Sequence, residues 1–156
     1  MIDLETRSIR AQILQKLGER CQNLLALLPN GSDGEPSVFW ARRGLSPSEL
    51  PAIVVNPEVE SGDRTFGEDQ LTMPVTFSMA CLLGNNNAVD LGEFLLAEMR
   101  RQIPDTDTTL GDLAKTIRYV QGGSDDYPER DDQALVVSAT FEIDYETVKN
   151  NPNEGV

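Results

Sequence analysis

The chain has 156 residues, a length that suits one domain with a single hydrophobic core. Its 13 basic and 26 acidic residues give a formal net charge of -13, which disfavours direct binding to nucleic acid phosphates or to anionic lipid. It contains no histidine, so catalytic sites that need imidazole and most zinc sites are excluded. Any enzyme built from this chain would depend on carboxylates, lysine or tyrosine.

Two further features of the sequence bear on location and redox chemistry. No apolar run approaches the roughly 20 residues that cross a bilayer, and Asp3, Glu5 and Arg7 argue against a signal peptide. We therefore expect the protein in the cytoplasm, with no membrane partner. Cys21 and Cys81 each lie in a periodic apolar pattern, which favours two buried thiols over a disulfide framework or a metal site.

The first element in chain order is an amphipathic helix. Apolar residues recur at three- and four-residue spacing from Ile9 to Leu28, which predicts one buried helix face. Asp3 is the expected N-terminal cap, and Pro29 and the turn residues after it end the helix. The basic residues of this helix lie mainly off the apolar stripe, which favours a solvated face over a partner surface.

Short strands and a loop follow this helix. Residues 38–41 and 52–55 are β-favouring and are bounded by turn residues, so each predicts a short strand. Trp40 lies in the first of them, and we favour core packing over an interface anchor. Residues 58–70 contain acids and glycines with almost no apolar residues, which predicts a mobile hairpin or loop.

Two long strands carry the clearest alternation. In residues 71–83 every second position is apolar, which predicts one buried face, and Pro74 places this strand at an edge or at a bulge. Residues 135–146 alternate in the same way and predict a half-buried antiparallel strand. A second amphipathic helix lies between them and ends at Pro104, with Asn87 or Asp90 as its cap.

The remaining segments are shorter. Residues 110–114 predict a helical turn, and residues 117–120 a strand. That strand runs into Gly122 and Gly123, which we interpret as a turn with positive φ rather than a phosphate cradle. Residues 150–156 show no period and predict a frayed tail.

The element order predicts an α+β fold. We expect a two-layer sandwich with a mainly antiparallel mixed sheet and two main helices packed on one face. Residues 1–149 form the single domain, and residues 150–156 the flexible tail.

The acids of residues 125–132 invite a calcium or magnesium hypothesis. Their spacing does not fit an EF-hand, because other residues interrupt the series and no glycine occupies the middle position. A solvated loop or a contact surface fits better, so we expect no metal, no cofactor and no catalytic residue. The candidate interface residues are Arg42, Arg43, Asp63, Arg64, Glu68, Asp69, Asp125, Asp126, Tyr127, Arg130, Asp131 and Asp132.

Two stretches of the sequence are informative together. Residues 122–135, GGSDDYPERDDQAL, lead into the alternating strand that ends at Tyr145 and Glu146. Near the N-terminus, a helix that opens with Ile9 and Arg10 leads through an aromatic strand to LPAIVV at residues 50–55. In these residues and in the order of its elements, the chain resembles the tail terminator proteins of long-tailed phages, the minor tail protein U family of phage lambda.

The resemblance implies a structural role rather than catalysis. The subunit would assemble as a six-membered ring on the tail tube, stop its polymerisation and present its other face to the head completion or connector protein. DNA would pass through the ring without specific binding, and an excess of carboxylates suits such a channel. The expected location is the virion, at the head-proximal end of the tail, after assembly in the host cytoplasm. We hypothesise that the acidic loops line the channel and that residues 58–70 form an arm that orders on a neighbour.

Three alternatives stay open. A head-tail connector or neck protein of similar fold would share the alternating strands and the acidity. An acidic DNA mimic has the necessary charge, but the acids of this chain concentrate in loops rather than along an extended surface. A carboxylate-based, metal-dependent hydrolase is the alternative that we place last.

Overall fold

The computed structural model describes residues 7–29, 35–65, 67–130 and 132–156, with the backbone alone for residues 64 and 65. Within these residues the chain forms an α+β fold with two α-helices and a seven-stranded mixed sheet. The elements are α1 Ile9–Leu25, β1 Ser37–Trp40, the short 3-10 helix η1 Pro47–Glu49, β2 Ala52–Pro57, β3 Ser61–Thr65, β4 Glu68–Leu82, α2 Ala88–Gln102, β5 Thr116–Gly123, β6 Ala134–Val148 and β7 Asn151–Gly155.

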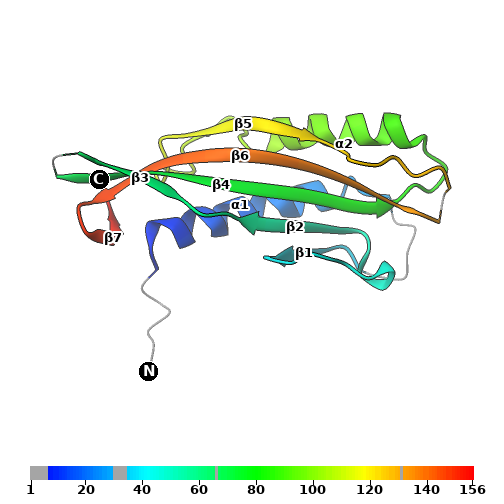
Figure 1. The fold of residues 1–156 in the computed structure, drawn as a ribbon, viewed down its shortest axis with the longest axis horizontal. Coiled ribbons are helices and arrows are strands. Elements are labelled where there is room, and N and C mark those ends of the chain that lie inside the picture. The colour runs from blue at the N-terminus through cyan, green and yellow to red at the C-terminus, as the bar shows by residue number, and fades with distance from the viewer. Residues whose placement is uncertain (1–6, 30–34, 66, 131) are drawn as a thin grey trace, which may run out of the picture.

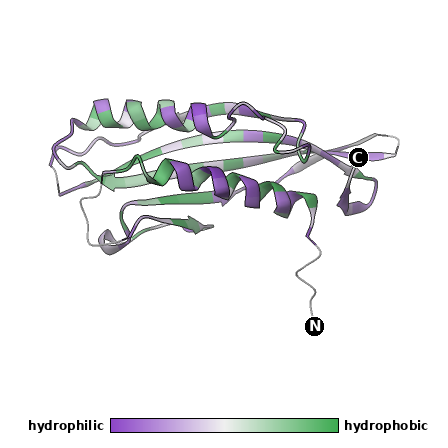
Figure 2. Ribbon diagram, turned by 180° about the vertical axis from the view of Figure 1, so that it is seen from behind, coloured by the Kyte–Doolittle hydropathy of each residue, from purple (hydrophilic) through white to green (hydrophobic). Residues whose placement is uncertain are grey.

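The strands are arranged in the order β1-β2-β4-β6-β5, with β3 paired to β4 and β7 paired to β6 (Figure 1). Only the pairing of β1 with β2 is parallel among the described strands, which confirms the prediction of a mainly antiparallel mixed sheet. Both helices cover the same face of the sheet, and Figure 2 shows hydrophilic and hydrophobic residues alternating along each of them. The predicted two-layer architecture is therefore confirmed.

The core lies between the helices and the central pair of strands. In β4 and β6 the odd-numbered residues from Met73 to Cys81 and from Leu135 to Tyr145 are buried, as the alternation predicted. Phe77 and Phe141 meet edge to face in this layer, with ring centroids 5.8 Å apart. The main core cluster also includes the two cysteine thiols and the apolar stripes of both helices.

The structure confirms one of the predicted helix caps. Asn87 accepts hydrogen bonds from the backbone N–H groups of Val89 and Asp90 at the start of α2, as predicted. At the start of α1 the cap is Ser8, whose hydroxyl accepts from the N–H of Ala11 at 3.1 Å. Asp3, the cap that we expected, lies outside the described residues.

The strand that contains Pro74 lies in the middle of the sheet, so the prediction of an edge was wrong. The alternative of a bulge agrees with the structure on one side of β4: β2 pairs as far as residue 75, and β3 starts opposite residue 72 with the register shifted by one residue. The register of β4 with β6 runs from residue 68 to residue 82 without interruption. The Pro74 carbonyl accepts from the Glu58 N–H at 2.8 Å, so the Pro74 nitrogen faces the gap between the end of β2 and the start of β3. The Glu58 carbonyl opposite that nitrogen accepts instead from the guanidinium of Arg10 at 2.9 Å. Proline is tolerated here because an arginine replaces the hydrogen bond that proline cannot donate.

Two other backbone predictions need correction. The tail that was predicted to be frayed contains the strand β7, which pairs with the end of β6. Residues 110–114 form turns rather than a helical turn, because Leu110, Gly111 and Asp112 have φ values of 53°, 70° and 67°, in the left-handed region.

Glycine and tryptophan positions also differ in part from the expectations. Gly123 has a positive φ of 144°, as predicted. Gly122 instead allows close packing, because a Cβ there would lie 2.8 Å from the Ser138 carbonyl oxygen. Trp40 is 42% exposed rather than buried in the core. Its ring lies over Gly18, where a Cβ would come within 2.7 Å of it.

Candidate functional site

The face of the sheet that carries no helix is largely polar. Hydroxyl pairs cross β4 and β6 on this face, with Thr76 and Thr140 at 2.9 Å and Ser78 and Ser138 at 2.8 Å. Nearer the end of β6, Arg118 donates to the carboxylates of Glu142 and Asp144 on this face. These ion pairs neutralise part of the negative charge of the face. We call this surface the open face.

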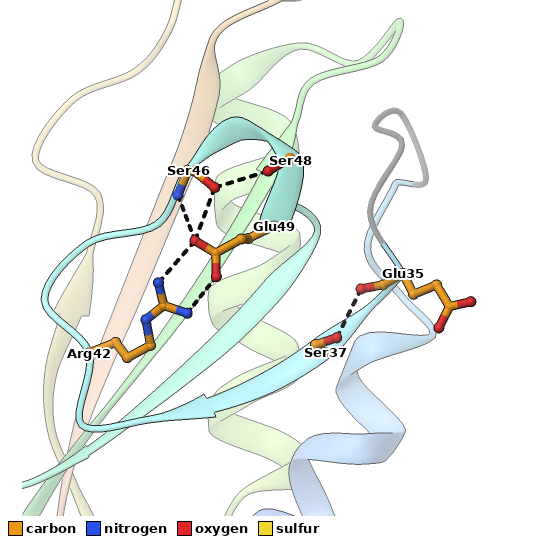
Figure 3. Close-up of polar contacts among 6 residues, drawn as sticks. All are labelled: Glu35, Ser37, Arg42, Ser46, Ser48 and Glu49. Atoms are coloured by element: carbon orange, nitrogen blue, oxygen red, sulfur yellow. Dashed lines mark hydrogen bonds and ion pairs between the residues drawn. The ribbon is translucent and has the colours of Figure 1, made fainter.

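One end of the open face is covered by the segment at residues 41–50, which a pair of charges holds together (Figure 3). The guanidinium of Arg42 donates to both carboxylate oxygens of Glu49, one of them at 2.9 Å, and lies 4.7 Å above the ring of Phe39. The N–H of Ser46 also donates to this carboxylate, at 2.9 Å. These hydrogen bonds, above all that from Arg42, lower the pKa of Glu49 from 4.5 to about 2. The segment is thus held as a fixed wall.

Between this wall and the sheet lies a groove of about 370 Å³. Its apolar surface includes Leu45, Val54 and Val136, the last of which is 45% exposed. Among the described residues that line it, two are arginines and none is acidic. Arg42 is neutralised by its carboxylate partner, whereas the exposed side chain of Arg43 makes no ion pair or hydrogen bond within the described part of the chain. We name this site the Arg43 groove.

The opposite end of the central ladder forms a second surface, which we name the acidic arm (residues 61–65, 68–71 and 145–155). There β3 and β7 flank the ends of β4 and β6, beyond the helices at the left of Figure 1. The exposed Asp63 lies on β3, and Asp69 accepts from the backbone N–H of Asn150 at 3.0 Å. In the segment 58–70, which was predicted as a mobile hairpin or loop, residues 61–65 form β3 and pair with residues 68–72 of β4 as a hairpin. The hypothesis that this arm orders only on a neighbour therefore does not hold for β3, which is paired within its own chain.

A cluster of polar contacts fixes the base of the acidic arm to α1. Arg10 contacts the carboxylate of Glu60 at 2.9 Å, and the hydroxyl of Tyr145 donates to the same carboxylate at 2.5 Å. Tyr145 is almost fully buried. Its burial, together with the hydrogen bond to Glu60, raises the tyrosine pKa well above its usual value. The hydroxyl therefore stays protonated and continues to donate.

The second predicted acidic surface, the loop between β5 and β6, lies beside the open face. Asp125 lines a shallow pocket with Glu58 and Thr140, while Asp126 and Asp132 are exposed. The partly exposed Tyr127 packs its ring against α2, where a Cβ at Gly92 would lie 3.1 Å from it.

The predicted interface residues therefore fall into three groups rather than one site. Arg42 and Arg43 line the groove, the residues of β3 and of early β4 belong to the acidic arm, and the remainder lie on the β5–β6 loop. In that loop Arg130 pairs with Asp132 at 3.4 Å. Asp131 and the side chain of Arg64 lie outside the described residues.

Sequence reasoning missed two features. The apolar floor of the groove was missed because Val54 and Val136 belong to strands on opposite sides of β4 and come to line one groove only through the sheet. The contacts of Arg10 were missed because a basic residue off an apolar stripe is more often solvated. The one signal for them was Pro74 in a strand, which leaves the facing carbonyl without its usual donor.

The chemistry available at these surfaces is that of charge and apolar contact. In the described residues no group of three or more cysteines and carboxylates is placed to hold a metal ion. Burial raises the pKa of Cys21 to about 12 and that of Cys81 to about 11. No helix in the described part of the chain is long and apolar enough to span a membrane. A comparison with protein-family models gave no match, and a comparison with curated proteins gave none either.

Proposed function

We propose that this protein is a phage tail terminator, which forms a ring on the end of the tail tube, stops tube polymerisation and provides the surface for head-tail joining. The proposal begins from the resemblance of residues 50–55 and 122–135 to that family. The observation that carries it further is the acidic arm, an extension of hydrogen-bonded strands that projects past both helices, with only the first residues of α1 against its base.

An extension of this kind suits assembly because its shape is fixed before a partner binds. Its backbone is already paired in strands, so docking requires little loss of conformational entropy. The charge of the subunit also suits a ring through which DNA moves, since a net charge of -13 opposes retention of phosphates. Both features favour a protein that contacts other proteins and releases DNA.

The test is polymerisation of tail tube protein in the presence and absence of this protein. We expect electron micrographs to show shorter tubes, each with a ring of added density at one end only. Tube lengths that do not change, with no protein at the tube end, would contradict the proposal. Binding to the head side alone, with tube length unaffected, would instead favour a head-tail connector.

A further inference from the structure

The Arg43 groove has the features of a receptor for an acidic protein surface. Its floor is apolar, its wall is held by the contacts between Arg42 and Glu49, and Arg43 stands exposed at its rim. In the whole chain carboxylates outnumber cations two to one, 26 against 13. The described residues that line the groove include two arginines and no acid, so the groove carries positive charge on a protein that is negative overall. An apolar floor beside a cation favours a partner that presents carboxylates around apolar or backbone surface.

The net charge of the chain restricts how two copies can associate. Two subunits that each carry a charge of -13 repel one another unless an interface brings carboxylates against cations. Most arginines of the described residues already have partners within the chain, as Arg10, Arg20 and Arg118 do. Arg43 has no hydrogen bond or ion pair among the described residues, so its charge is available to an interface between copies.

The sheet edges are poorly suited to this association. At the two ends of the main strand order, β1 has only four residues and β5 carries an irregularity between Tyr119 and Gln121. The other described strands that pair on one side only, β3 and β7, belong to the acidic arm itself. Short and bulged edge strands hinder pairing with a strand of another chain. This leaves the faces and ends of the sheet as the surfaces for contact.

The acidic arm supplies the complementary charge, and it cannot reach the groove of its own chain. Ala80 lines the groove, and Gln70, the partner of Asp63, lies ten positions earlier on β4 (80 minus 70). At roughly 3.3 Å per residue these positions are about 33 Å apart. A contact between arm and groove is therefore a contact between two copies, and it joins two different surfaces. Such heterologous contacts close into rings when the rotation between subunits permits.

We propose that the Arg43 groove receives the acidic arm of a second copy of this chain, with Arg43 facing Asp63 and the other carboxylates of the arm. The inference rests on the proposed function and deepens it, because it assigns the contact that joins neighbours in the ring. The arm docks as a preformed hairpin, the apolar floor of the groove packs against it, and the charges orient it.

The test measures self-association of the full chain by analytical ultracentrifugation at low salt, without tube protein. Arg43→Glu and Asp63→Lys each place like charges together, and we expect either variant alone to associate roughly tenfold more weakly or worse. Lys16→Glu is the matched control: it makes the same charge change on the outer side of α1, where its neighbour is Glu19 at 3.8 Å. This control should associate as the original protein does.

Mixing the two variants separates direct contact from misfolding. In an equimolar mixture two contacts between the variants become possible. The altered groove of the Arg43→Glu variant can receive the altered arm of the Asp63→Lys variant. The original groove of the Asp63→Lys variant can receive the original arm of the Arg43→Glu variant. Both contacts join opposite charges, so association should return in the mixture.

Two outcomes would overturn the inference. One is a protein that stays monomeric at its highest soluble concentration, and the other is a mixture that associates no better than its components. Association that follows these rules without any capping of tubes would leave the inference standing and refute the proposed function.

Discussion

Arg10 offers the sharpest test of how the base of the acidic arm is held. Arg10→Ala removes the donor to the Glu58 carbonyl and the ion pair with Glu60, each at 2.9 Å. The hydrogen bond contributes about 1 kcal/mol, and the partly exposed ion pair contributes up to about 1 kcal/mol. We therefore expect the free energy of unfolding to fall by about 1 to 2 kcal/mol.

The structural reason is tested by a second substitution, Pro74→Thr. It restores a backbone N–H that faces the Glu58 carbonyl, and threonine suits a strand. In the Arg10→Ala background this N–H replaces the lost donor, so the double variant should recover about 1 kcal/mol. In the original protein the same carbonyl already has a donor, so Pro74→Thr should gain less.

The assay is urea unfolding of the four proteins in this double-mutant cycle, with the slope m checked for constancy. Arg7→Ala is the control next to the same helix, since its guanidinium contacts only Gln15 among the described residues and its loss should change stability by less than about 0.5 kcal/mol. A coupling energy below about 0.3 kcal/mol between the two sites would refute the reasoning.

Three further outcomes follow from the structure. Gly122→Ala should destabilise the fold by about 2 kcal/mol or more in thermal unfolding, because the new Cβ meets a backbone carbonyl of β6, whereas Gly44→Ala, with open space around it, should not. Because its folded pKa is lowered to about 2, Glu49 stabilises the fold fully above the unfolded value of 4.5, and this contribution is lost as pH falls toward 2. An NMR titration that gives the Glu49 carboxyl a pKa near 4.5 in the folded protein would contradict this expectation. With pKa values of about 12 and about 11, Cys21 and Cys81 should not react with a thiol reagent at about pH 8 until urea unfolds the chain.

The candidate surfaces were only partly predictable. Sequence reasoning named Arg42, Arg43 and Asp63 as interface candidates. It gave no reason to expect that a carboxylate neutralises Arg42 while Arg43 stays available to a partner. That distinction depends on Glu49, which the chain brings against Arg42 through the turn at η1. Likewise, the acids of residues 58–70 were expected in a mobile segment, because backbone pairing with β4 leaves no apolar signal in the sequence.

The sequence by itself determined the faces. The period-two alternation of β4 and β6 and the stripe of α1 fixed which side chains are buried, because side-chain direction follows from local backbone geometry. Only the tertiary structure decided the neighbours: that β4 is central despite Pro74, that residues 151–155 pair with β6, and that the groove and the arm lie far apart. Strand partners are chosen by contacts between residues distant in sequence, and no local pattern records those contacts.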